Sequence, residues 1–205
     1  SSSTRLPKKI FLEIKGITIL EYVIQRVKQV KKINKIVVAT TDGKEDDDTE
    51  KLCRKIGIDC FRGSEQDVLD RYFKCAKKYP EYGNIVRITG DCPLIDPKVI
   101  DQVISLFEKG KFDYVSNVLK ETFPDGMDVE IFRREVLFEA SSKAVMASER
   151  EHVTLYMVNN QNFKKGNFES EKDYSHIRLT VDRQEDFEVV KFLIENSFPE
   201  DSYLK

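Results

Sequence analysis

Two aspartates that lie far apart in the chain each follow a short apolar run, and together they could bind a metal ion. Asp91 stands two residues after the run Ile85–Thr89, and Asp182 directly follows the run Ile177–Val181. Carboxylate oxygens are the ligands that hard cations prefer in proteins. Each aspartate taken alone is more often a turn or helix-cap residue. Two of them at strand ends, however, predict one shared cation site.

The first nine residues, SSSTRLPKK, combine small hydroxyl side chains with basic ones. Hydroxyl groups and backbone N–H groups in a tight loop can bind phosphate oxygens, while Arg5 and Lys9 would supply positive charge to a triphosphate. The alternative is a solvated basic terminus, which composition alone favours at least equally. The segment is therefore a candidate phosphate-binding loop.

A further candidate spans residues 61–71, FRGSEQDVLDR, where a predicted strand ends, turns and enters a helix. Backbone donors at that helix N-terminus would meet a phosphate or a base edge. Spacing alone favours a structural alternative, in which Asp67 caps the helix while Asp70 and Arg71 lie on its exposed face.

These residues must be positioned by strands and helices that alternate along the chain. Apolar residues at helical spacing from Ile19 to Val30 predict an amphipathic helix, and the β-branched run Ile36–Thr40 predicts a strand. We further expect helices over residues 49–56, 67–79, 96–108, 134–142, 148–160 and 185–197, strands over 58–61, 85–89, 114–117, 129–132 and 177–181, and a polar loop over 164–173. Such alternation implies a mainly parallel sheet between helical layers. The expected fold class is α/β, with ligands bound beyond the carboxyl ends of the strands.

Composition limits the class of partner. The 205 residues suffice for one domain and are too few for two ordinary domains with a linker. The 34 basic residues nearly balance the 36 acidic ones, which favours a small-molecule partner over nucleic acid or anionic lipid. No apolar run approaches the roughly 20 residues that cross a bilayer. The four cysteines form no CxxC pair and no zinc-binding pattern, which favours reduced thiols in a cytoplasmic protein.

Six segments, in order along the chain, resemble the motif series of one family. They are SSSTRLPKK, FRGSEQDVLDRY, RITGDCPLIDP, TFPDGMDVEIF, SEREHVT and RLTVDRQEDFE. The series resembles that of the spore coat polysaccharide biosynthesis protein F family, which is similar to the cytidylyltransferases that activate Kdo and sialic acids. It covers nearly the whole chain, and six ordered motifs are far more specific than one. The resemblance implies a single three-layer α/β/α nucleotide-diphospho-sugar transferase domain over residues 1–205, whose mixed, mainly parallel sheet has one short antiparallel strand.

The resemblance also implies an activity and its participants. Such an enzyme joins CMP from CTP to a sugar or sugar acid, releases pyrophosphate, uses Mg²⁺, serves cell-surface or spore-coat polysaccharide synthesis and forms a homodimer. Asp91 and Asp182 would be the Mg²⁺ ligands, and Arg5 and Lys9 would hold the triphosphate. The nucleotide side would also include Ser3, Thr41, Asp42, Arg62, Gly63, Ser64, Asp67 and Arg71. Asp42 and the glycine after it are equally well explained as an ordinary turn pair.

Two motifs are expected to hold the acceptor sugar. Asp125, Asp128 and Glu130 could accept hydrogen bonds from sugar hydroxyls. Arg150 and His152 could pair with a carboxylate or phosphate on the acceptor. The alternative is equally supported: the first motif would be a turn and the second a solvated helix start.

The chain departs from the family pattern at its front. Lys8 stands where relatives usually have glycine, which puts a close backbone approach at this position in doubt. The family's preceding strand, which normally ends in Gln-Ala-Arg with a phosphate-contacting arginine, is not in the sequence. We expect about ten further residues ahead of Ser1 that form a central strand, because a sheet lacking its middle strand leaves backbone groups unpaired. We also expect the chain to continue at its C-terminal end.

Two other functions remain open from the sequence. A glycosyltransferase of the same general fold would hold a nucleotide-sugar diphosphate with an Asp-x-Asp pair, which Asp46-Asp47-Asp48 matches formally. These carboxylates open a predicted helix, where they would stabilise the helix dipole. The second alternative is a catalytically impaired nucleotide-binding protein, which the unusual Lys8 keeps open.

Overall fold

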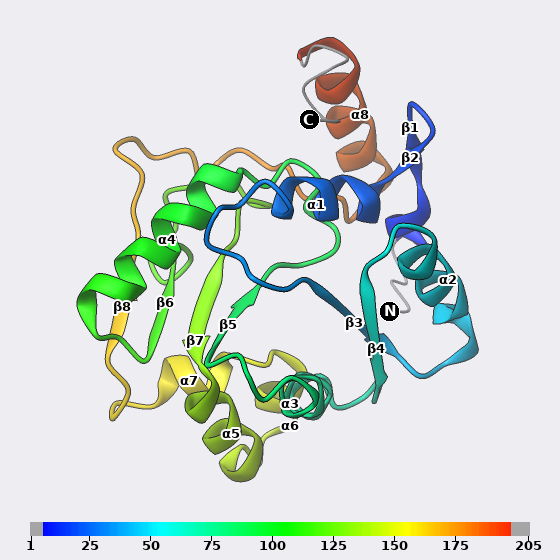
Figure 1. Cartoon of the computed structure of the whole chain (residues 1–205). Coiled ribbons are helices and arrows are strands. Elements are labelled where there is room, and N and C mark those ends of the chain that lie inside the picture. Colours follow the sequence, from blue (N-terminus) through cyan, green and yellow to red (C-terminus); the bar gives the residue numbers. More distant parts are fainter. Residues whose placement is uncertain (1–5, 198–205) are drawn as a thin grey trace.

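A β-sheet lies between two layers of helices (Figure 1), and the computed structural model describes residues 6–197 of the chain. The strands are β1 (Glu13–Ile14), β2 (Ile17–Thr18), β3 (Val37–Thr41), β4 (Asp59–Gly63), β5 (Asn84–Arg87), β6 (Tyr114–Ser116), β7 (Glu130–Arg133) and β8 (Lys165–Asn167). The helices are α1 (Ile19–Val27), α2 (Asp47–Lys55), α3 (Val68–Lys78), α4 (Pro97–Gly110), α5 (Arg134–Lys143), α6 (Ala147–Glu151), α7 (Leu155–Asn159) and α8 (Gln184–Ser197), with short 3-10 turns η1 (Lys9–Phe11) and η2 (Lys44–Asp46). Helices α1 and α4 pack on one face of the sheet, and α3, α5 and α7 pack on the other.

The sheet is mixed. Strand β3 pairs in parallel with β4, and β6 pairs in parallel with β8. Strand β7 runs antiparallel to both of its neighbours in the order β5-β7-β6-β8. The expected α/β class is therefore confirmed, and β7 is the antiparallel strand that the family resemblance implies.

Within residues 6–197, β3 pairs only with β4, and β5 pairs only with β7, so one edge of each strand has no strand partner. The apolar residues Val37, Val38, Ile85 and Val86 of these strands stay partly exposed, although the strands lie between helical layers. A further strand at such an edge would pair its backbone and bury its side chains. The expected central strand would provide this partner, and it stays a prediction.

Local sequence signals explain where α1 begins. Thr18 and Glu21 form a capping box, in which the Glu21 N–H donates to Thr18 Oγ1 at 3.2 Å and the Thr18 N–H donates to Glu21 Oε2 at 2.9 Å. The apolar face of α1 then buries Leu20, Val23 and Val27 against neighbouring helices and the sheet. The helix ends at Val27, three residues before the predicted end. No helix in the described part of the chain is long and apolar enough to span a bilayer.

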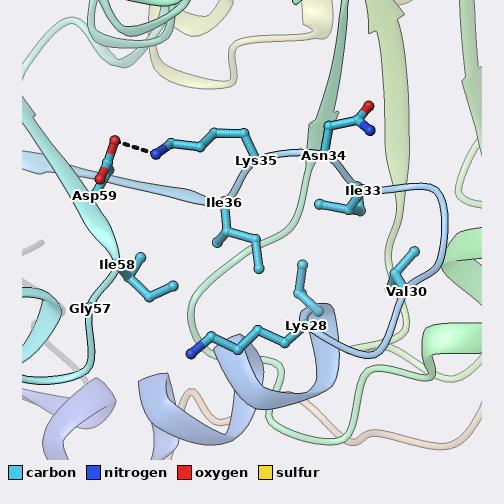
Figure 2. Close-up of a pocket in the computed structure, with 10 residues that line it drawn as sticks. Lys28, Val30, Ile33, Asn34, Lys35, Ile36, Gly57, Ile58 and Asp59 are labelled. Carbon is cyan, nitrogen blue, oxygen red and sulfur yellow. Dashed lines mark ion pairs between the residues drawn. The ribbon is translucent and has the colours of Figure 1, made fainter.

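A cavity of about 260 Å³ opens at the amino ends of β3 and β4 (Figure 2). Its apolar wall consists of Val27, Val30, Ile33, Ile36 and Ile58. On its rim, Lys35 Nζ pairs with Asp59 at 2.6 Å. Ligands of open parallel sheets bind beyond the carboxyl ends of the strands, so this cavity lies at the opposite end from the expected site.

The prediction of one helix over residues 148–160 is wrong, because the chain turns sharply between α6 and α7. Val153 has a φ of 54°, in the left-handed region that β-branched side chains disfavour. The N–H of Thr154 donates to the carbonyl of His152 at 2.5 Å and closes a three-residue turn. Val153 is completely buried beside Met157 and Leu137, so core packing offsets the backbone strain.

The predicted strand over residues 177–181 is also wrong. This segment divides its backbone hydrogen bonds between two loops: the Leu179 N–H donates to Asp125 at 2.7 Å, and the Val181 N–H donates to Asp91 at 2.9 Å. Only an isolated bridge between Asp125 and Arg178 results. The loop expected over 164–173 is partly wrong, because β8 lies within it. Its pairing with β6 is a long-range contact that its polar residues do not signal.

Candidate active site

Lys9 joins the two aspartates that sequence analysis singled out. Its Nζ donates to Asp91 Oδ2 and to Asp182 Oδ1, each at 2.5 Å. Two 2.5 Å contacts to one nitrogen place these oxygens at most about 5 Å apart. Only 11% of the Lys9 side chain is exposed. Both carboxylates therefore converge on one cation, which in this structure is an ammonium group, and their binding of a metal ion stays a prediction.

The backbone around Asp91 fixes its place beside Asp182. Strand β5 ends at Arg87, and the following turn brings Thr89 Oγ1 within 3.0 Å of the Cys92 sulfur. The carbonyl of Asp91 accepts the N–H of Val181, the residue before Asp182. Burial raises the pKa of the Cys92 thiol, so this neighbour stays neutral. The turn after β5 and the segment before α8 therefore hold the aspartates together.

Asp182 is oriented from a second side by Arg178, a residue that sequence analysis missed. Arg178 Nη2 donates to Asp182 Oδ2 at 2.9 Å, and its Nε donates to Asp186 Oδ1 at 2.9 Å. Its Nη1 forms an ion pair with Asp125. The sequence did carry a signal for Arg178. Residues 178, 180 and 182 of an extended segment point to the same side, which places Arg178 on the side of Asp182. Arg178 therefore joins three carboxylates, which we call the acidic cluster: Asp125, Asp182 and Asp186. Even so, 43% of its side chain stays exposed.

Asp186 completes this support at the start of α8. Its Oδ2 accepts the backbone N–H of Asp182 at 3.0 Å and that of Arg183 at 2.9 Å. These bonds pair the backbone donors of the two residues that directly precede α8. Each oxygen of the Asp182 side chain therefore accepts from one cationic side chain, Lys9 or Arg178, while Asp186 holds the backbone of Asp182.

The ion pairs shift the ionisation of the central groups. Burial alone would lower the pKa of Lys9, but hydrogen bonds and charges from Asp182 and Asp91 raise it above the ordinary value. The hydrogen bond from Lys9, followed by Arg178, lowers the pKa of Asp182. Lys9 is therefore cationic and Asp182 anionic around neutral pH.

Of the three carboxylates expected to bind the acceptor, Asp125 belongs to the acidic cluster and Asp128 lies within range of the charge of Asp125. Asp125 pairs with Arg178, and burial together with the neighbouring carboxylates raises its pKa. Burial, and then the charges of Asp125 and Glu130, raise the pKa of Asp128 to about 6. Glu130 differs, because its carboxylate is buried in contact with Arg87 and accepts the Tyr114 hydroxyl hydrogen at 2.7 Å. The structure thus gives Glu130 a role in the core, which argues against its expected contact with a sugar.

The strand-end residues expected near the nucleotide contact one another. Arg62 donates from Nε to the carbonyl of Thr41 at 3.0 Å and from Nη2 to that of Gly43 at 2.6 Å, and its Nη1 pairs with Asp47 at 2.6 Å. The N–H of Asp42 donates to the carbonyl of Gly63 at 2.9 Å, which aligns the ends of β3 and β4. The side chain of Arg62 is occupied within the loop after β3, and that of Asp42 is exposed.

At the start of α3 the structural alternative holds for Asp67. Its Oδ1 accepts the N–H of Asp70 at 2.8 Å, so it caps the helix. Its Oδ2 accepts two hydrogen bonds from Arg150, at 2.6 and 2.9 Å. Arg71, in contrast, is buried and donates to the carbonyl of Ser64 at 2.7 Å, so its predicted exposed position is wrong.

Arg150 and His152, the other residues expected near the acceptor, have different surroundings. Besides its pairing with Asp67, Arg150 donates to the carbonyl of Ser141 at 2.7 Å near the end of α5. Its guanidinium therefore joins three helices. His152 lies exposed at the end of α6, where its side chain is accessible to a ligand.

The Asp-x-Asp segment is occupied by other contacts. Asp46 is buried and accepts the N–H of Thr41 at 3.0 Å and its hydroxyl hydrogen at 2.5 Å. Although burial opposes ionisation, hydrogen bonds from threonines lower the pKa of Asp46 to about 2. Asp47 pairs with Arg62, and Asp48 pairs with Lys51 at 3.0 Å. The three carboxylates point to different partners, which argues against a shared diphosphate site.

The pair Asp91 and Asp182 fits a magnesium site on chemical grounds. Two carboxylate oxygens already converge on one positive charge, and Mg²⁺ takes one or two carboxylates together with waters and substrate phosphates. Among the described residues, no group of three or more His, Cys, Asp or Glu side chains is arranged to hold a metal ion. Any ion at this pair would therefore need ligands from water or substrate.

Lys8 adopts a backbone conformation that favours glycine. Its φ is 56°, in the left-handed region that costs a residue with a Cβ about 1 kcal/mol. Lys8→Gly should therefore be about 1 kcal/mol more stable than Lys8→Ala in urea unfolding. Both variants remove the exposed 3.6 Å contact with Asp48, so their difference isolates the backbone. Equal stabilities would contradict this explanation.

Ser3 and Arg5 lie outside the described residues.

The chain is similar to known proteins over nearly its whole length. The cytidylyltransferase family model matches residues 1–202. The chain is 34% identical over 205 residues to the spore coat polysaccharide biosynthesis protein SpsF of Bacillus subtilis, covering 95% of this chain and 83% of that protein. A solved cytidylyltransferase from Leptospira borgpetersenii superposes with a TM-score of 0.92 at 40% identity, covering 99% of this chain and 87% of that one.

A more distant solved structure shares the fold alone. It is the CMP:2-keto-3-deoxy-manno-octonic acid synthetase complexed with CTP, with a TM-score of 0.74 at 18% identity, covering 96% of this chain and 95% of that one. The family match extends over nearly the whole sequence, including every motif quoted above. The chain therefore belongs to the cytidylyltransferase family.

Proposed function

We propose that this protein transfers CMP from CTP to a hydroxyl group of a sugar or sugar acid and releases pyrophosphate, in the synthesis of a cell-surface or spore-coat polysaccharide. The observation that carries the proposal is the pair of carboxylates gathered on one cation in a chain of the cytidylyltransferase family. The names of the similar proteins support this proposal: the family and a 40% identical solved relative are named cytidylyltransferases, and SpsF is named for spore coat polysaccharide synthesis. We place the reaction in the cytoplasm and expect a homodimer.

The chemistry requires positioning and charge stabilisation more than covalent help. The acceptor oxygen forms a bond to the α-phosphorus of CTP, the bond to the pyrophosphate oxygen breaks, and the hydroxyl proton passes to a basic group or to water. Mg²⁺, when bound, would neutralise charge on the phosphate oxygens. Asp91 and Asp182 are the residues proposed to hold it. Lys9 would then bind a phosphate through its ammonium group.

The acceptor is proposed to approach from the side of Asp125 and Asp128. Asp125 belongs to the acidic cluster through its ion pair with Arg178, and Asp128 is close enough for the charge of Asp125 to raise its pKa and for its own charge to raise the pKa of Cys92. Carboxylates are good acceptors for sugar hydroxyls. A pKa of about 6 leaves Asp128 ionised at neutral pH, where it would accept the hydrogen bond of an attacking hydroxyl.

Pyrophosphate release is the direct test of this function. We expect release from CTP and Mg²⁺ that depends on one member of a panel of sugar acids, with 2-keto-3-deoxy-manno-octonic acid included. The matched controls replace CTP with UTP, GTP or ATP, and each should give much less pyrophosphate. Transfer of sugar from a nucleotide sugar, without pyrophosphate release, would favour a glycosyltransferase. No turnover with any acceptor, together with tight CTP binding, would favour a nucleotide-binding protein.

His152→Ala tests the placement of the acceptor. Because His152 is exposed, its replacement should leave the fold intact, whereas Arg150→Ala would also break contacts among helices. We expect the KM for the acceptor to rise about tenfold while the KM for CTP changes little, as for the loss of one charged hydrogen bond. Equal changes for both substrates, or no change, would place the acceptor elsewhere.

A further inference from the structure

The ammonium group of Lys9 occupies the place that a metal ion would need. It lies 2.5 Å from one oxygen of each aspartate, and these are the contacts on which the proposed metal site depends. Metal–oxygen distances near 2.1 Å would require the same two oxygens to close on a divalent ion instead. An ammonium group left between them would be repelled strongly at such short range. The two cations therefore exclude each other.

Asp182 is poorly placed to serve both cations by turning its side chain. Its second oxygen accepts from Arg178 at 2.9 Å, and its backbone N–H is held by Asp186 at 3.0 Å. Turning the carboxylate would break the contact with Arg178, which is itself held by Asp186 and Asp125. Lys9 has a flexible four-carbon stem and is the more mobile partner. Metal entry therefore requires the lysine, rather than the aspartate, to move.

A displaced Lys9 needs a new anionic partner. Its side chain is mostly buried, and loss of both aspartates would leave an ammonium group beside a divalent cation. A triphosphate that enters with the metal supplies phosphate oxygens to receive it. Free Mg²⁺ brings no such partner. Asp91 and Asp182 can therefore bind a metal–nucleotide complex, whereas Lys9 keeps the metal alone from binding to them.

We propose that Lys9 is a built-in counter-ion that couples metal binding to nucleotide binding. Without nucleotide it holds Asp91 and Asp182 together and blocks the divalent ion; with CTP it transfers to the triphosphate and releases both carboxylates. This role rests on the proposed metal site of the cytidylyltransferase reaction. It assigns Lys9 a function in the free protein in addition to its contact with substrate.

The test is binding of Mn²⁺, a paramagnetic substitute for Mg²⁺, measured by electron paramagnetic resonance without nucleotide. Methionine matches the length of lysine and lacks its charge. We expect Lys9→Met to bind Mn²⁺ at least about tenfold more tightly than the wild-type protein, corresponding to 1.4 kcal/mol or more. Lys143→Met, which removes an exposed lysine paired with Glu139 in α5, should bind like the wild type. Adding CTP should raise the affinity of the wild-type protein for Mn²⁺ and bring it closer to the Mn²⁺ affinity of Lys9→Met.

A second variant locates the gained affinity. Lys9→Met combined with Asp91→Asn should lose the additional Mn²⁺ binding if it arises at this pair. Equal Mn²⁺ affinities of the wild type and a folded Lys9→Met variant would overturn the proposal, as would a gain that survives Asp91→Asn. These results are independent of catalysis. An active wild-type enzyme with no effect of Lys9→Met contradicts only the counter-ion role, whereas a clear effect in a protein that does not consume CTP contradicts only the proposed function.

Discussion

Asp182→Asn is expected to lower kcat by about a thousandfold, equivalent to about 4 kcal/mol in the activation barrier. Asparagine keeps the shape of the side chain and removes the charge that holds the proposed metal and orients Lys9. Loss of metal-based stabilisation of the phosphate charge accounts for an effect of this size. Asp91→Asn should cause a similar loss, and the double variant should be little worse because the two residues act as one unit. Steady-state pyrophosphate release measures each value.

Two controls separate loss of chemistry from loss of structure. Asp48→Asn makes the same chemical change at an exposed carboxylate paired with Lys51, and it should retain nearly full activity. It also tests the Asp-x-Asp alternative, since a glycosyltransferase would lose activity there. Thermal unfolding should show that Asp182→Asn remains folded, because about a third of this side chain is exposed. An Asp182→Asn variant with near-normal turnover would refute the assignment of this residue.

Glu130→Gln should destabilise the protein by about 3 kcal/mol, the largest effect on stability that we expect from a single change. Its carboxylate lies in the core between Arg87 and Tyr114, and glutamine leaves the guanidinium without a negative partner. Removing one partner of a buried ion pair lowers the free energy of unfolding by about 3 to 5 kcal/mol. We expect a loss at the lower end of this range because 24% of the Arg87 side chain is exposed. Glutamine still accepts the hydrogen of Tyr114, so the loss reports on the ion pair. Urea unfolding measures it.

A double variant identifies the cause of this destabilisation. Arg87→Met combined with Glu130→Gln removes the unpaired guanidinium and should recover part of the lost stability. The KM for the acceptor, measured below the unfolding transition, should change little in Glu130→Gln. A stable variant with a greatly raised KM for the acceptor would instead show that Glu130 contacts the acceptor sugar, as its motif alone had suggested.

The spacing of the motifs predicted the central part of the site better than its surroundings. Asp91 and Asp182 converge because the Val181 N–H donates to the carbonyl of Asp91, and apolar runs before a carboxylate are visible in the sequence. Helix caps at Thr18, Asp67 and Asp96 follow local rules that depend on a few neighbouring residues. Local signals of this kind need no knowledge of the fold.

The features that the sequence did not reveal depend on partners far away in the chain. The segment 177–181 has the composition of a strand, yet its hydrogen bonds go to two separate loops. Strand β8 forms because β6 offers it an edge. The left-handed Val153 is held by core packing against its own preference. Glu130 and Arg178 are charged residues in motifs of similar appearance, and only the fold buries one and brings the other to the cluster.

A crystal structure with CTP and Mn²⁺ would test the central claim most directly, because anomalous scattering locates the metal independently of the model of the protein. We predict one anomalous peak between the carboxylates of Asp91 and Asp182, about 2.1 to 2.2 Å from an oxygen of each and bound to phosphate oxygens of CTP. The Lys9 ammonium should then lie on a phosphate oxygen rather than between the aspartates. A metal bound elsewhere, with Lys9 still joining Asp91 and Asp182, would contradict the account.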